Sequence, residues 1–399
     1  VLGSLAASPE ADPAAVTRGL EIAVGLSDYW LGRHPAEGLD WLGRLIEAAD
    51  PAPPLRAAAL LARGHLAYWV TDFERGAEIV AEAQVIFASL GDRLGEGRAL
   101  RRRGAIAAAT DDMPAARRYL EASLARLEEA GVDREIGTTL LHLGSLLADE
   151  GVVDAARPAL ERALVIAAAT GDPLANGHVL AALALAHWKG GDLEAAMQTG
   201  NQAMLIFREL GHRPTEGTVA CRLAAVARGL DRPRAARRYA QLAIDAGEQS
   251  STRTTVALGH LNLARIDLDT GDEAGAAGHL VRSLERIDPV ADRWVLVEAL
   301  EAVARLLVAS ERPGSGQLLT AAATIRRVIH QPVPPTELAD LEWTVAQGGS
   351  IDGSDRPPEG DPPASGTLGP AAAHTLAAAQ ARELARPAPG PARLRRARG

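Results

Sequence analysis

Three arginines at positions 98, 101 and 102 form the local cluster whose residue types and spacing most clearly suggest a binding site. On a helix these positions are i, i+3 and i+4, so Arg98, Arg101 and Arg102 share one face. Guanidinium groups on one face can make charge-assisted hydrogen bonds to carboxylates. Because the chain carries a net charge of −9, this local positive charge favours an acidic or C-terminal segment of a protein or peptide as partner. The alternative is that these are ordinary solvated arginines in an arginine-rich sequence.

No motif that would identify an enzyme occurs in the sequence, and we expect no cofactor. Lys189 is the only lysine, and it stands in HWKGGD and not after a glycine-rich phosphate-binding loop. The patterns G-x-G-x-x-G after a strand, H-E-x-x-H and G-x-S-x-G are also absent. Paired acids such as Asp111 and Asp112 fall in predicted turns, where capping of a helix is the expected role. We therefore expect a non-enzymatic protein.

The sequence likewise predicts no metal site and no membrane segment. The ten histidines lack ligand spacing; His178 and His187, for example, are nine residues apart. Cys221 is the only cysteine, which excludes a disulfide framework, favours the cytoplasm and predicts a packed residue rather than a nucleophile. No run of 18 apolar residues and no initial charged-then-apolar segment occurs. The negative net charge argues against direct binding of nucleic acid by this chain.

A repeat with a period of 40 residues positions these side chains between residues 57 and 333. Self-similarity at a fixed period of this size is typical of a stacked array of supersecondary units. Small residues form columns through seven units, and small side chains let neighbouring helices approach closely. One column is Gly64, Gly104, Gly144, Ala184, Ala224, Ala264 and Ala304; the next is Gly76, Ala116, Ala156, Ala196, Ala236, Ala276 and Gly316.

Each unit is predicted to hold two helices. In the third unit, apolar residues spaced i, i+4, i+7 and i+11 predict a helix over residues 134–150, and a second begins near Val153. Glycines 40 residues apart, at 91, 131, 171 and 211, suit the left-handed caps that end helices. The turn inside the unit repeats an aspartate, as at Asp72, Asp112, Asp192 and Asp272, that can cap the second helix.

These columns and the turn GDLEAA (Gly191 to Ala196) resemble the tetratricopeptide repeat over about seven tenths of the chain. The usual period of that repeat is about 34 residues, whereas HEAT and armadillo units run about 40–47. Helix pairs of near-equal length, the acidic turn and the alanine column favour the tetratricopeptide alternative. The resemblance implies an all-α, tetratricopeptide-like superhelical solenoid of about seven to eight helix-hairpin repeats, in the extended form found in sensor regions of large bacterial regulators.

We divide the chain into three parts. Residues 1–56 are expected to form an irregular capping repeat, with helices over 20–31 and 35–49 and apolar anchors at Trp30, Trp41, Leu42 and Leu45. Residues 57–346 form the repeat solenoid, which closes with a Pro-Pro turn at Pro334. Residues 347–399 are rich in proline and glycine and are expected to be disordered, apart from a weak helix over 371–385 and an arginine-rich end.

The segments WLGRHPAEGLDWLGRLIEA (Trp30 to Ala48) and 312–346 resemble the start and the end of the repeat region in bacterial ATPase-type transcriptional regulators. This implies a sensor part of a LuxR-type or antibiotic-regulatory-type (SARP-like) regulator. Such relatives carry an ATPase and a helix-turn-helix reader, so ATP and DNA binding are not transferred to any residue here. Because the chain starts at Val1, it is open whether it is a fragment. The alternatives are a free-standing adaptor and a receptor for a small ligand or quorum-type peptide.

The first helix of each unit is expected to line a concave groove that holds a peptide or protein segment. The register gives the predicted lining as His65, Tyr68, Trp69, Arg98, Arg101, Arg102, His142, Ser145, Asp149, His178, Trp188, Arg222, Arg228, Asn262, Arg265, Glu298 and Arg305.

Overall fold

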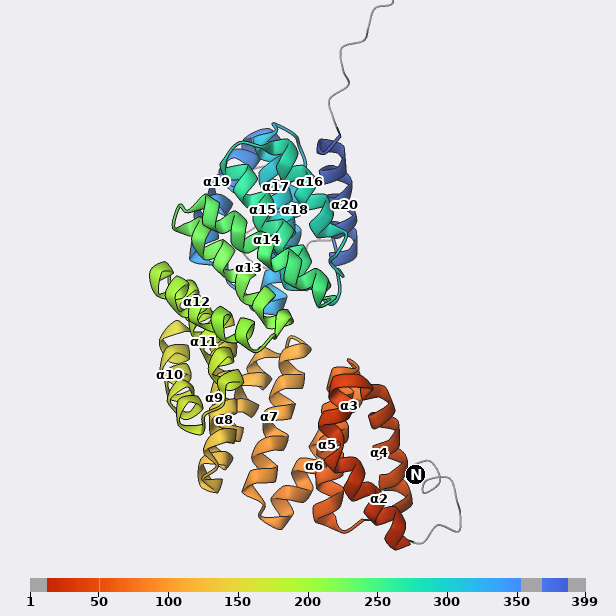
Figure 1. Ribbon diagram of the computed structural model, residues 1–399. Helices are drawn as coiled ribbons and strands as arrows, with labels where there is room; N and C mark the ends of the chain where they lie inside the picture. The colour runs from red at the N-terminus through yellow and green to blue at the C-terminus, as the bar shows by residue number, and fades with distance from the viewer. Residues whose placement is uncertain (1–12, 50, 353–367, 387–399) are drawn as a thin grey trace, which may run out of the picture. The chain divides into compact units, whose positions relative to one another are not determined.

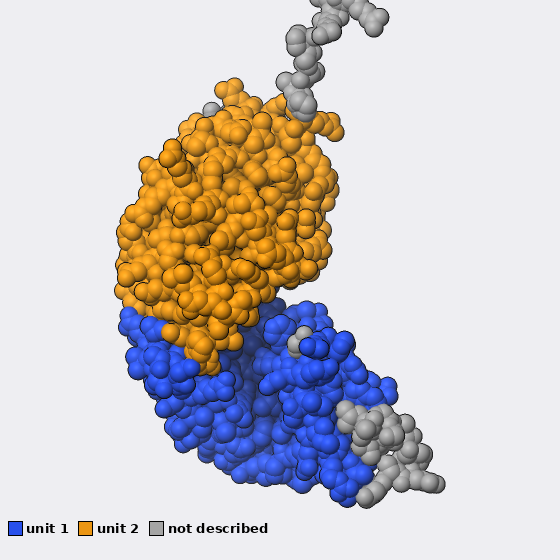
Figure 2. All heavy atoms as spheres, viewed as in Figure 1, with its two compact units in different colours: residues 1–147, 158–171 blue, residues 148–157, 172–399 orange. Residues whose placement is uncertain are grey.

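The computed structural model is helical throughout the residues that it describes, which are 13–49, 51–352 and 368–386. Nineteen helices, α2 to α20, follow one another in these ranges without a strand (Figure 1). No helix in this described part is long and apolar enough to cross a membrane. The chain divides into two compact units, residues 1–147 with 158–171 and residues 148–157 with 172–399 (Figure 2).

The helices of the first unit include three before the repeats. They are α2 (Pro13–Gly25), α3 (Ser27–Arg33), α4 (Pro35–Ala49), α5 (Pro53–Trp69), α6 (Phe73–Leu90), α7 (Arg93–Ala109) and α8 (Met113–Ala130). Two helices, α9 (Asp133–Asp149) and α10 (Val153–Thr170), contain residues of both units.

The second unit holds the remaining helices. They are α11 (Pro173–Lys189), α12 (Leu193–Glu209), α13 (Arg213–Gly229), α14 (Pro233–Gln249), α15 (Arg253–Asp269), α16 (Glu273–Leu284), α17 (Arg293–Ala309), α18 (Ser315–Ile329), α19 (Pro335–Asp352) and α20 (Pro370–Leu384).

Consecutive helices pack as hairpins, and fourteen of them, α5 to α18, cover the seven predicted repeat units. This confirms the all-α, tetratricopeptide-like fold. The small-residue columns lie where helices approach most closely. A Cβ atom added to Gly64 would come within 2.3 Å of a methyl carbon of Val80, and Ala196 is fully buried. A larger side chain in these columns would force the two helices of a hairpin apart.

The repeated turns have the geometry that the sequence predicts. Gly91 and Gly131 adopt left-handed φ angles of 71° and 67°, a region that costs a residue with a Cβ atom about 1–2 kcal/mol. The side chain of Asp192 accepts a hydrogen bond from the backbone N–H of Ala195 at 3.1 Å and so caps α12. Asp112 and Asp272 cap α8 and α16 in the same way, but Asp72 makes no such bond to α6.

The N-terminal helices differ from the expectation. A single helix over residues 20–31 was wrong, because the chain forms α2 from Pro13 and then α3, with the break at Leu26. The break lets Trp30 turn into the core of the first unit, where it is 4% exposed beside the buried Leu42 and Leu45. The first repeat also starts earlier than residue 57, since Pro53 occupies the first turn of α5, where its missing N–H costs nothing.

Part of the expected disordered tail is an ordered helix. Residues Pro370–Leu384 form α20, as the weak helix over 371–385 suggested, and this helix packs against α16, α17 and α18 (Figure 1). Its Ala373, Ala377 and Ala381 are fully buried. Helix α16 has only 12 residues, against 17 or 18 in the second helices of the five preceding repeats. The arginine-rich end, from residue 387 onward, lies outside the described residues.

Candidate functional site

A cavity of about 370 Å³ opens between the first helices of successive repeats in the second unit. Its wall is built by one residue of α9 and by residues of α11, α13, α15 and α17, with Thr252 from the connection between α14 and α15 and Gln331 from that between α18 and α19. This volume falls in the range of small-molecule sites, about 300–1,000 Å³. Its lining is Asp149, Leu185, Trp188, Lys189, Thr218, Cys221, Arg222, Ala225, Thr252, Thr254, Thr255, Leu258, Asn262, Arg265, Trp294, Glu298 and Gln331.

Asn262 presents a hydrogen-bond acceptor that the described residues leave unused. Its side chain is 5% exposed, and its Nδ2 donates to the carbonyls of Cys221 and Leu258, at 3.2 and 3.0 Å. These two bonds fix the amide orientation, so Oδ1 is buried without a hydrogen-bond partner among the described atoms. A buried acceptor without a partner costs about 1–3 kcal/mol, so the approach of a hydrogen-bond donor to this atom would be favourable.

Charged side chains also converge on the cavity. Arg265 is buried and forms an ion pair with Glu298 at 3.0 Å. Lys189 and Arg222 are half-buried, and Asp149 lies near both. Burial raises the pKa of Asp149, and the positive charges of Arg222 and then Lys189 oppose that shift.

Cys221 is a buried thiol in this wall, in surroundings that disfavour its thiolate form. The thiol is 4% exposed and its Sγ lies 3.5 Å from the carbonyl of Thr255, to which it donates. Burial raises the pKa of Cys221 to about 12, and the positive charge of Arg222 opposes that shift only in part. The packed role predicted from the sequence is confirmed, and the residue also lines the cavity.

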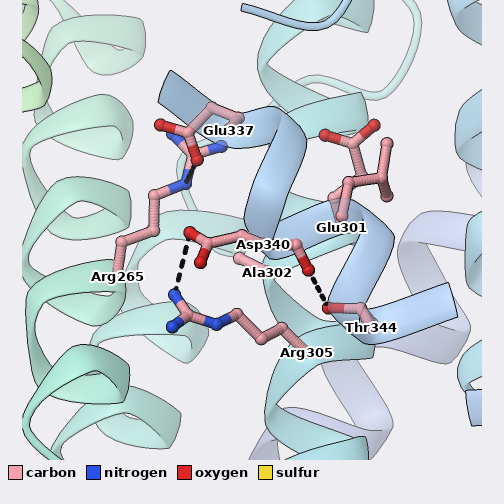
Figure 3. A pocket seen from close by; sticks show the side chains of 8 residues that line it. Arg265, Glu301, Ala302, Arg305, Glu337, Asp340 and Thr344 are labelled. Atoms are coloured by element: carbon pink, nitrogen blue, oxygen red, sulfur yellow. Dashed lines mark hydrogen bonds and ion pairs between the residues drawn. The ribbon is translucent and has the colours of Figure 1, made fainter. Parts of the chain in front are cut away.

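Helix α19 closes one side of this region through a group of arginines and carboxylates that we call the α19 clamp: Arg228, Arg265, Arg305, Glu337 and Asp340. Arg228 of α13 contacts both Glu337, at 3.1 Å, and Asp340. Arg265 of α15 reaches Glu337 at 3.4 Å, and Arg305 of α17 reaches Asp340 at 3.1 Å (Figure 3). At Thr336, the residue before Glu337, the indole N–H of Trp188 donates a hydrogen bond at 3.0 Å, so α19 also contacts the cavity wall.

The clamp is an internal site and not a second ligand site. Burial alone would raise the pKa of Glu337, but Arg265, Arg228 and Arg305 together hold it below its ordinary value. Asp269 of α15 also pairs with Arg228 and Arg305, so every guanidinium there already has carboxylate partners. The space left beside these residues is only about 20 Å³, enough for about one water.

The structure brings together six side chains of the predicted groove lining, namely Asp149, Trp188, Arg222, Asn262, Arg265 and Glu298. Their role in ligand binding remains a prediction. The cavity wall also contains residues that the register did not select, above all Lys189 and Trp294. Lys189 directly follows Trp188 at the end of α11, so its position next to a predicted lining residue was the available signal.

The arginine cluster of α7 lies in the first unit and is already engaged. Arg98 and Arg101 both pair with Glu135 of α9, each at 2.6 Å. Arg102 lies over the ring of Tyr68, 5.5 Å from its centroid, and burial followed by repulsion from Arg101 lowers its pKa to about 10. A carboxylate partner is therefore present, but it belongs to the next repeat of this chain.

The other predicted residues lie apart from the cavity. His65 accepts a hydrogen bond from the indole of Trp69, and burial followed by the positive charges of Arg102 and Arg101 lowers its pKa to about 3. Trp69 is 57% exposed. His142 and Ser145 lie on α9, and the His178 ring packs on Phe207, with centroids 5.0 Å apart.

Several solved structures share this fold. A Rap protein complexed with competence and sporulation factor has a TM-score of 0.56 at 13% identity, over 77% of this chain and 81% of that one. The Rap conjugation gene regulator of plasmid pLS20, in complex with the Phr* peptide, has a TM-score of 0.53 at 14% identity, over 78% and 95%. The apo quorum sensor NprR of B. thuringiensis has a TM-score of 0.50 at 13% identity, over 71% and 88%.

At these identities the likeness shows the fold alone, a tetratricopeptide-like helical repeat. No family model matches the chain, and no curated protein matches its sequence.

Proposed function

We propose that this chain is a non-enzymatic sensing module that binds a short peptide or peptide-like molecule in the cavity of its second unit. The observation that carries the proposal is the buried Oδ1 atom of Asn262, an acceptor fixed in the cavity wall without a partner among the described residues. A peptide main chain supplies N–H donors at regular spacing, and the apolar side chains of Leu185 and Leu258 offer contacts for its side chains.

Structures of the same fold support a peptide as the ligand class. One of them holds the Phr* peptide and another the competence and sporulation factor. The sequence supports the finer setting, since residues 30–48 and 312–346 resemble the repeat region of LuxR-type and SARP-like regulators. We propose a role in transcriptional regulation, in the cytoplasm, on that resemblance. The test compares transcript profiles of the wild-type strain and of a strain lacking the gene, each grown with and without the peptide that the chain binds. If the two strains do not differ in either condition, a role in transcriptional regulation is excluded.

Affinity selection tests the binding proposal directly. The purified chain is incubated with a defined pool of synthetic tripeptides to heptapeptides, and retained peptides are identified by mass spectrometry. Ala225→Phe places a ring in the cavity at a side chain that is 5% exposed, so we expect this variant to lose the peptides that the wild type retains. Val165→Phe, at a side chain 70% exposed, is the control and should retain them. Equal retention by the wild type and Ala225→Phe would exclude the cavity as the binding site.

A further inference from the structure

Resting on the proposed function, we infer that the cavity recognises a carboxylate of its ligand, and that Lys189 and Arg222 are the residues that bind it. The two cations come from α11 and α13, the first helices of successive repeats, and both line the cavity. The ligand class is then a short peptide with a free C-terminal carboxylate, or an acylated amino acid of similar size.

Most carboxylates around the cavity form ion pairs with arginines other than Arg222. Glu298 pairs with Arg265 at 3.0 Å, and Glu301 holds Arg326 through two contacts of 2.7 Å. Glu337 is held within the α19 clamp. None of these carboxylates lies within ion-pair distance of the two cavity cations in the described part of the chain.

Lys189 and Arg222 therefore differ from the arginines of the α19 clamp. Arg228, Arg265 and Arg305 each contact two or more carboxylates, whereas no carboxylate among the described residues forms an ion pair with Lys189, whose ammonium lies 5.5 Å from the ring centroid of Trp188. Asp149 is the one remaining acid of the wall, and burial raises its pKa. The wall thus carries more positive than negative charge within a chain of net charge −9.

Burial makes these unpaired charges costly, and a bound carboxylate would offset the cost. Burial lowers the pKa of Lys189, and Asp149 opposes the shift only in part. An anionic group between Lys189 and Arg222 would favour the charged form of the lysine and supply the acceptor that its N–H donors lack. A phosphate could exploit the same charges, but the neighbouring Asn262 acceptor demands a donor on the same ligand, which an amide N–H supplies.

The size of the cavity limits how much of the ligand can enter behind its carboxylate. A volume of about 370 Å³ lies near the lower end of the range of small-molecule sites, about 300–1,000 Å³. One or two peptide residues fit, with the terminal carboxylate at Lys189 and Arg222, a main-chain N–H at Asn262 Oδ1 and an apolar side chain against Leu258 and Trp294.

The test compares matched peptides that differ only at their C-terminus. N-acetylated tripeptides with an apolar last residue are presented to the wild-type chain as free acids and as C-terminal amides, and the bound fraction of each is measured by equilibrium dialysis. We expect the acids to bind about tenfold or more tighter, the scale of one charge-assisted hydrogen bond. The double variant Lys189→Gln, Arg222→Gln should abolish this preference, whereas Arg234→Gln, on the exposed start of α14, should keep it.

The possible outcomes distinguish the carboxylate inference from the proposed peptide-binding function. If acids and amides bind the wild type equally, the carboxylate inference is wrong and the peptide-binding function stands. If neither set binds, although circular dichroism shows the chain folded, the proposed function itself fails and the inference with it. The comparison on the wild type needs no variant, so a misfolded double variant would not weaken the result.

Discussion

Replacing Arg228 by methionine should weaken the packing of α19 against α13, α15 and α17. The guanidinium of Arg228 is the centre of the α19 clamp, because it contacts Glu337 and Asp340 of α19 and also Asp269 of α15. Its side chain is only 10% exposed, so solvent screens these contacts little. Methionine keeps most of the length and the apolar stem of the side chain and removes the charge and the N–H donors.

The expected magnitude depends on the partners that the carboxylates keep. Removing one partner of a buried ion pair costs about 3–5 kcal/mol. Here Glu337 keeps Arg265, and Asp340 keeps Arg305, so we expect the lower end, about 3 kcal/mol. At 1.36 kcal/mol per tenfold, this corresponds to an opening equilibrium about 150-fold more favourable. A lysine at position 228 should rescue only part of the loss, because an ammonium cannot present the planar fork that reaches three carboxylates.

Hydrogen–deuterium exchange measures this opening. At neutral pH the amides of α19 should lose about 150-fold in protection, while those of α14 keep theirs. Arg232→Met is the matched control, since its pair with Glu194 is half exposed and exposed pairs contribute about 0–1 kcal/mol. Less than about fivefold loss in α19, or an equal loss in α14, would refute the view that the clamp is what holds α19 in place.

The same contacts predict a pH dependence of definite sign. Arg228 and Arg305 hold the pKa of Asp269 below its ordinary value despite burial, and Arg265 and Arg228 do the same for Glu337. Groups with lowered folded-state pKa values stabilise the folded form above their ordinary pKa, about 4, and that stabilisation is lost as the pH falls through the lowered values. We therefore expect the protection of α19 in the wild type to be constant from neutral pH to about 5 and to fall only in acid.

Three further predictions concern the thiol, the caps and the small-residue columns. With its pKa raised to about 12, Cys221 should be ionised in only about 10⁻⁴ of the molecules at pH 8. Labelling of the native chain by iodoacetamide should therefore be about 1,000-fold slower than that of an exposed cysteine, and it should become fast once urea unfolds the chain. Fast labelling of the native chain would contradict the burial of this thiol. Asp192→Ala should lower the free energy of unfolding by about 1 kcal/mol in urea titrations through loss of its cap, whereas Asp72→Ala, which makes no cap bond, should be nearly neutral; equal losses would show that capping is not the cause. Ala196→Leu should lower the free energy of unfolding by about 1–3 kcal/mol, because it overpacks a fully buried position. Ser145→Leu, at a half-buried position, should change it by no more than about 0.5 kcal/mol. A larger loss for Ser145→Leu than for Ala196→Leu would mean that the repeat register is wrong.

The repeat pattern was sufficient to predict the fold because it encodes contacts between neighbours. Gly64 against Val80, or the left-handed Gly91, are local requirements that recur every 40 residues and so leave a periodic trace in the sequence. The same register placed Asn262 and Arg222 on the inner helices, and the cavity contains both.

Contacts without a period could not be predicted in this way. Arg228 and Glu337 are 109 residues apart, and Trp188 and Thr336 are 148 apart, so no column marks their pairing. For the arginine cluster, the missing information lies in the neighbouring repeat. Arg98 pairs with Glu135, 37 residues later, and a comparison of adjacent repeats could have suggested this contact; the role of the cluster in ligand binding stays a prediction.

The position of Lys189 in the cavity wall has a practical consequence for chemical probes. Since it is the only lysine among the 399 residues, an amine-selective reagent has one lysine side chain to attack, and that side chain lies beside Trp188 and Arg222. The lowered pKa of Lys189 leaves more of it in the nucleophilic, neutral form near neutral pH than an exposed lysine has. An acylating or imine-forming fluorophore would therefore report from within the cavity itself, and lysine-directed cross-linking would say almost nothing about the rest of the fold.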